Sequence, residues 1–199
     1  MALINRNLLQ KTLSSKAGPI LEKKIIPQLQ AQFEDAKKKA LSDFDQHPIT
    51  REIKEGPNAS NSSGTLRGIG NLYSYIGFDS GDNPIGKLRE LLASKIRIRN
   101  KVSRKSDFVF YIVVDIPDDR EIQSVTKLPW APGRSWAKGI EDGLSGLGNY
   151  LVTNSEKSRS GTAIQVEAAV SSSTFSTTPY LTKIIQDLIL SLEKNIVIK

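Results

Sequence analysis

The residue sets in this sequence that could support chemistry are all incomplete. Gly68-Ile69-Gly70-Asn71-Leu72-Tyr73 begins like a dinucleotide-binding fingerprint, but it lacks the third glycine and no hydrophobic strand precedes it. Gly143-Leu144-Ser145-Gly146 lacks the glycine spacing of a nucleophile elbow, and a catalytic triad could draw its base only from His47. We therefore expect a protein that is not an enzyme and that uses no cofactor.

Metal chemistry is disfavoured by the available ligand types. The chain has no cysteine and a single histidine, which excludes thiolate sites and leaves too few imidazoles for a His-rich zinc site. The clustered carboxylates lie in segments with turn character: Asp79, Asp82, Asp115, Asp118 and Asp119. Turn formation and helix capping explain these aspartates better than metal binding does, so we expect no metal site.

One segment is suited to binding. Six cations follow one another without an acidic residue between Glu90 and Asp107: Lys95, Arg97, Arg99, Lys101, Arg104 and Lys105. On a strand, the first four would share one face at intervals of about 7 Å. Such a row could protect a sheet edge, meet an acidic protein surface or follow a phosphate backbone. Aromatic residues do not alternate with the cations, which disfavours binding to single-stranded nucleic acid.

The first element that would position these residues is a long amphipathic helix over 18–44. Its apolar residues recur at spacings of three and four: Ile26, Leu29, Phe33, Ala36, Ala40 and Phe44. Pro27 predicts a break or a new start, and His47-Pro48 predicts the end of the helix. The stripe would pack either on its own domain or on a neighbouring subunit.

A loop and a mixed core follow that helix. Residues 47–70 contain a Gly/Asn/Ser-rich stretch between Glu55 and Gly64, which predicts a flexible loop that only partners would order. The expected strands are 71–78, 96–99, 107–116 and 162–170, with a hairpin turn at Arg104-Lys105-Ser106. The expected helices are 84–94 capped by Asn83, 136–151 capped by Ser135, and a last one opened by Thr178-Pro179. Gly139, Gly143 and Gly146 would lie on one side of the helix over 136–151, where another backbone could approach closely.

This irregular order predicts an α+β fold, with a small, mainly antiparallel sheet packed with helices, a long N-terminal helix and an extended arm. We expect one domain, made of an arm and helix over 1–46, the loop over 47–70 and a core over 71–199. The longest apolar run, Phe108 to Val114, is far too short for a membrane span, and the N-terminus lacks a signal-type apolar run. We expect assembly in a reducing cytosol. The net charge of +7 favours acidic partners without choosing between protein and nucleic acid.

Ser63-Gly64-Thr65-Leu66-Arg67-Gly68-Ile69 resembles a segment of the neck and tail-completion proteins of tailed bacteriophages, including the minor tail protein Z group. In that family a long N-terminal helix often precedes a Thr-Gly-x-Leu-Arg-x-Ser-Ile-like segment. Ser63 and Gly64 stand for the first pair, Leu66 and Arg67 for the second, and Ile69 for the last residue. Gly68 and the long insert before the segment depart from the pattern, and the likeness covers about a third of the chain.

The resemblance implies a virion protein, assembled in the host cytoplasm, that forms a ring between head connector and tail, hexameric in many relatives. Its partners would be further copies of itself, connector-side proteins, and tail-tube or terminator proteins, with DNA passing through the ring and no membrane. The expected partner-binding residues are the six cations together with Leu66, Arg67, Trp130 and Trp136. A tail-terminator or baseplate subunit and a basic nucleic-acid-binding domain are the alternatives.

Overall fold

The computed structural model has mixed helices and short antiparallel ladders, which confirms the α+β class. Backbone is described for residues 6–66, 70–99, 103–106, 109–111, 113–129, 131–143, 149–153, 163–167 and 178–195. Side chains are described over 23–66, 70–99, 113–129, 131–143 and 178–193.

The longest element is α1 (Arg6–Gln46), a helix of 41 residues and therefore about 60 Å long. The predicted stripe is buried from Leu29 through Phe33 to Phe44, and only Ile26 at its start is half-exposed. The break expected at Pro27 is wrong, because α1 continues through it. Pro27 and Lys23 are both exposed, so the carbonyl that loses its donor can face water.

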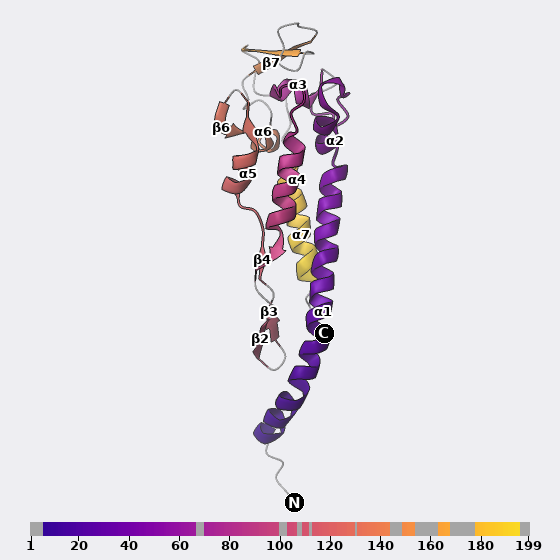
Figure 1. Cartoon of the computed structure of the whole chain (residues 1–199), viewed down its shortest axis with the longest axis vertical. Coiled ribbons are helices and arrows are strands. Elements are labelled where there is room, and N and C mark those ends of the chain that lie inside the picture. The colour runs from indigo at the N-terminus through magenta and orange to yellow at the C-terminus, as the bar shows by residue number, and fades with distance from the viewer. Residues whose placement is uncertain are drawn as a thin grey trace, which may run out of the picture.

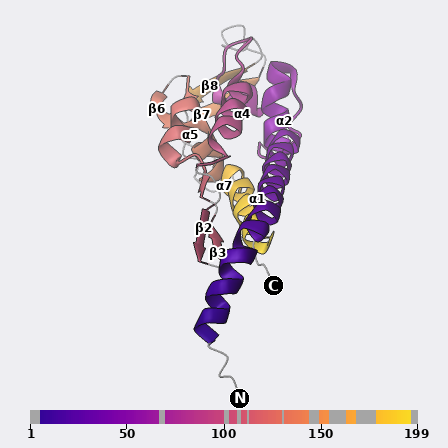
Figure 2. The ribbon, with the colours of Figure 1, turned by 60° about the horizontal axis from the view of Figure 1, so that its bottom comes forward.

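Helix α7 (Leu181–Asn195) lies antiparallel along the C-terminal half of α1 (Figures 1 and 2). Near its start, the Tyr180 ring stacks on Phe44 with the ring centroids 6.1 Å apart. The predicted stripe of α7 faces the core through Leu181, Ile184, Leu188 and Leu192. Because α7 ends beside the middle of α1, the first turns of α1 extend past the other described elements (Figure 1). We call residues 6–28 the α1 arm.

Three further helices pack at the C-terminal end of α1 and beside it: α2 (Pro48–Glu55), α3 (Leu72–Ile76) and α4 (Pro84–Lys95). Helix α4 starts at the predicted cap, where Asn83 Oδ1 accepts from Gly86 N at 2.8 Å. The strand expected over 71–78 is wrong. Asn71 Oδ1 accepts from Ser74 N at 2.9 Å and starts a helix, which Gly77 ends with φ +84°.

Four two-stranded antiparallel ladders complete the described structure: β1 (Arg97–Ile98) with β4 (Val114–Asp115), β2 (Ser103–Ser106) with β3 (Val109–Tyr111), β5 (Lys127–Leu128) with β6 (Ala131–Ser135), and β7 (Asn149–Thr153) with β8 (Ala163–Glu167). The strand expected over 107–116 is divided between β3 and β4. The turn expected at Arg104-Lys105-Ser106 is also wrong, because these residues form β2 and pair with β3.

Two short helices lie on the side of α4 away from α1 (Figure 1): α5 (Asp119–Val125) and α6 (Trp136–Glu141). Ser135 caps α6 as expected, since its Oγ accepts from Lys138 N at 3.1 Å. The long helix predicted over 136–151 is wrong, because Gly143 adopts φ +88° after α6 and residues 149–153 form β7. A left-handed glycine ends a helix, so Gly143 lies beyond the helix that contains Gly139. Gly146 lies outside the described residues.

Within the part of the chain that the structure describes, no helix is both long and apolar enough to cross a bilayer.

Candidate interaction surface

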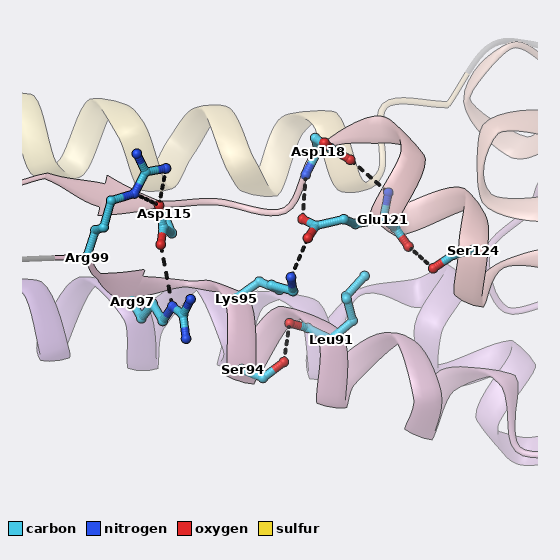
Figure 3. A network of polar contacts seen from close by, with 9 residues as sticks. All are labelled: Leu91, Ser94, Lys95, Arg97, Arg99, Asp115, Asp118, Glu121 and Ser124. Atoms are coloured by element: carbon cyan, nitrogen blue, oxygen red, sulfur yellow. Dashed lines mark hydrogen bonds and ion pairs between the residues drawn. The ribbon is translucent and has the colours of Figure 1, made fainter.

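Three of the four cations predicted to form one row, Lys95, Arg97 and Arg99, have local partners. Lys95 is the last residue of α4, and its Nζ contacts the carboxylate of Glu121 in α5 (Figure 3). This bond and a backbone bond from Asp118 lower the pKa of Glu121. Asp118 in turn caps α5, where its Oδ1 accepts from Glu121 N at 2.8 Å. Lys95 therefore links the end of α4 to the capping box of α5.

The next two cations share one carboxylate. Arg97 in β1 lies opposite Asp115 in β4, and Arg99 follows one residue after β1. Arg99 Nη2 is 2.5 Å from Asp115 Oδ1, and Arg97 Nε is 3.4 Å from Asp115 Oδ2 (Figure 3). The bond from Arg99 lowers the pKa of Asp115, with a smaller contribution from Arg97. The sequence expectation that Asp115 belongs to a turn is therefore wrong.

This surface remains cationic despite the pairing. Arg97 and Arg99 share the single carboxylate of Asp115, so one positive charge is left over beside β1, and both arginine side chains keep 64% of their surface exposed. Exposed ion pairs exchange readily with water and with competing anions. The arginines can therefore exchange Asp115 for a carboxylate of a partner protein without loss of the fold.

We expect the double variant Arg97→Gln, Arg99→Gln to fold normally, because exposed ion pairs contribute little to stability. Its melting temperature should stay within a few degrees of wild type, while its capture of acidic partner proteins falls. Thermal unfolding followed by circular dichroism measures the melting temperature. The control variant is Lys87→Gln, at an exposed position of α4. A steep fall in melting temperature would show that these cations are structural and not available to partners.

A second polar cluster orders the loop that the sequence predicted to be flexible. Glu52 in α2 is fully buried, and no cation is paired with it within the described residues. Its Oε1 accepts from Leu72 N at 2.7 Å and from Asn61 Nδ2 at 3.0 Å, and its Oε2 accepts from Ser63 N at 2.8 Å. The loop therefore has its own means of ordering, contrary to the expectation, and residues 48–55 are helical.

The same cluster also holds Leu66 of the Ser63–Ile69 segment in place. Asn61 Oδ1 accepts from Leu66 N at 3.2 Å, and the Leu66 side chain lies in the core with 3% of its surface exposed. Trp136 is also core, at 0% exposed, with its ring edge-on to Phe78 at 5.9 Å. Leu66 and Trp136 are thus unavailable to partners in this fold, since folding itself uses their apolar surface.

The other predicted binding residues are only partly placed. Arg67, Lys101 and Trp130 lie outside the described residues, while Arg104 and Lys105 are described by their backbone in β2. Their proposed roles remain predictions.

His47 is half-buried at the start of α2 and has a capping role there. Its Nδ1 accepts from Ile49 N at 3.3 Å and caps α2, and its ring lies against Tyr180 with the centroids 4.8 Å apart. Burial lowers the pKa of His47, and Lys183 lowers it further. A neutral ring fits the acceptor role of its Nδ1.

The carboxylates at Asp79 and Asp82 have the turn role expected of them, because Asp82 Oδ2 accepts from Asp79 N at 3.0 Å. Among the residues with described placement, no group of three or more His, Cys, Asp or Glu side chains could hold a metal ion. Comparison with known protein families, curated proteins and solved structures found no match to this chain.

Proposed function

We propose that this chain is a structural virion protein of a tailed phage, a neck or tail-completion subunit that forms a ring joining the head connector to the tail. The observation that carries the proposal is the α1 arm. In both views its first turns extend past every other described element (Figures 1 and 2). The Ser63–Ile69 resemblance supplies the class of particle.

A projecting helix needs a partner for physical reasons. Most helical stability in proteins comes from packing an apolar face, and an isolated helix in water is marginal even at fifteen residues or so. Gly18, Pro19 and Pro27 lower the helix propensity of the arm further. A neighbouring subunit that covers the arm would supply the missing packing, as in assemblies whose extensions become ordered on their neighbours.

The cationic surface around Arg97 and Arg99 gives the proposed subunit a second contact. Asp115 already binds both arginines, so a carboxylate on an acidic protein surface would be a ligand of the same kind. Connector-side or tail-tube proteins are the expected partners. A tail-terminator or baseplate subunit would use the same surfaces, and a nucleic-acid-binding domain would bind phosphates with the same cations.

Removal of the protein from such a particle should leave heads and tails complete but unjoined. In an extract that contains both, added protein should restore infectious particles in proportion to the amount supplied, because a structural part is consumed whereas an enzyme turns over. The measurement is a dose curve of infectious particles against added protein. Restoration by trace amounts would indicate catalysis, and normal particles in the absence of the protein would rule out the neck role.

A further inference from the structure

A groove lined by polar and apolar side chains lies between α4, α5 and the start of β5, with a volume of about 520 Å³. All of its lining residues keep part of their surface exposed, so the fold leaves them available to a partner. They are two lysines, two serines, two half-buried apolar residues and one glutamate: Lys87, Lys127, Ser94, Ser124, Leu91, Val125 and Glu90.

The groove borders the ion pair that links α4 to α5. Ser94 precedes Lys95 in α4, and Ser124 Oγ donates to the backbone oxygen of Glu121, the residue that Lys95 contacts (Figure 3). One end of the groove therefore lies beside this ion pair and next to the cationic surface. A partner that contacts the cationic surface could extend a segment into the groove.

The two serines of the groove present hydrogen-bond acceptors to a ligand. Ser94 Oγ donates to the backbone oxygen of Leu91 at 3.0 Å, and Ser124 Oγ donates to that of Glu121 at 2.6 Å. A hydroxyl has one hydrogen, so only the lone pairs of these two oxygens remain for a ligand. The ionised carboxylate of Glu90 also only accepts. A ligand that satisfies these three groups must therefore bring N–H donors.

The other lining residues add two further requirements. Lys87 and Lys127 are exposed and form no ion pair within the described residues, so they attract anionic groups. Leu91 and Val125 offer apolar surface. A peptide with acidic and apolar side chains meets all the requirements, since its backbone supplies the N–H donors. A phosphate backbone brings only acceptors and would place them against the two serine oxygens and a carboxylate.

We propose that this groove binds an acidic segment of a partner protein, with the carboxylates of the segment at Lys87 and Lys127 and an apolar side chain against Leu91 and Val125. The proposal deepens the proposed function, on which it rests for the identity of the partner, by naming where a connector-side or tail-tube protein docks. The groove and the cationic surface then form one continuous contact for an acidic partner.

Fluorescence anisotropy with labelled peptides tests the groove on the full-length protein. In each peptide one leucine lies between two aspartates, and the spacing of the aspartates varies across the set. Peptides of at least one spacing should bind wild type. The groove variant Lys87→Glu, Lys127→Glu should bind them about tenfold more weakly or worse, because two attractions become repulsions. Serine in place of the leucine should weaken binding to wild type several-fold, because the contact with the apolar lining is lost.

The matched control is Lys54→Glu with Lys183→Glu, which reverses two exposed charges outside the groove and should bind the peptides like wild type. No binding at any spacing, or an equal loss in the control, would overturn the proposal. So would duplex DNA that binds wild type more tightly than every peptide and is lost from the groove variant, because the groove would then be a phosphate site.

Failure of the proposed function can be distinguished from failure of the groove. Wild-type protein that binds the peptides but restores no joining in the extract would refute the neck role alone. Wild-type protein that restores joining but binds no peptide would refute the groove alone.

Discussion

Glu52→Ala should destabilise the fold by about 3–5 kcal/mol, because it leaves the N–H groups of Leu72 and Ser63 and the Asn61 amide without an acceptor at a site with little water. A buried donor that loses its partner costs about 1–3 kcal/mol. Urea unfolding gives the free energy. Hydrogen exchange at the Ser63 and Leu72 amides should accelerate before global unfolding, because these amides lose their bonds first.

Glu55→Ala is the matched control, since Glu55 ends the same helix and is exposed. It should change the free energy of unfolding by less than about 0.5 kcal/mol. Glu52→Gln should also destabilise, because its amide offers one acceptor oxygen and places an NH₂ group beside donors. If Glu52→Ala lost less than about 1 kcal/mol, the loop would be held by contacts other than this carboxylate.

Trp136→Ala should cost about 3–5 kcal/mol, since it empties a fully buried site in contact with the Phe78 ring. The variant separates two roles. Replacing a core tryptophan lowers the midpoint of urea unfolding. Replacing a tryptophan that only binds a partner leaves the midpoint unchanged and weakens association alone. We expect the first result, together with loss of the fluorescence signal that reports Trp136 burial.

Val113→Ala is the comparison for that experiment, because Val113 has 43% of its surface exposed. It should stay within about 0.5 kcal/mol of wild type. A Trp136→Ala chain with a wild-type unfolding midpoint would return Trp136 to the list of binding residues.

The sequence predicted elements correctly where a hydrophobic repeat or a helix cap lay within a few residues and no other local pattern conflicted with it. The stripe from Leu29 to Phe44, the Asn83 and Ser135 caps and the α7 stripe are repeats or caps readable within a few residues. The strand predicted over 71–78 was wrong because it relied on the aromatic residues. The Asn71 cap and Gly77 instead bound a short helix that is buried on every side. Where all faces are buried, periodicity carries no information.

The ion pairs of the cationic surface around Arg97 and Arg99 were harder to predict, because the paired residues are distant in sequence. Arg97 meets Asp115 and Lys95 meets Glu121 across separations of 18 and 26 residues. Glu52 likewise binds Leu72 at a separation of 20. In the sequence alone, the basic segment seems to lack counter-charges and the Gly/Asn/Ser-rich loop seems to lack hydrogen-bond partners. Only the tertiary structure brings the opposite charge or the acceptor to them.

Tyr180 has a consequence for how the chain is made. Its hydroxyl lies 2.6 Å from Thr50 Oγ1, across a separation of 130 residues, and burial raises the pKa of Tyr180 well above its ordinary value. Helix α7 covers the apolar stripe of α1. Because α1 precedes α7 in the chain, α1 emerges from the ribosome long before α7 does. During synthesis the nascent chain therefore carries an uncovered apolar helix, which exposes it to aggregation with other nascent chains. Chaperone binding to α1, released once α7 emerges, is the expected course of its biogenesis.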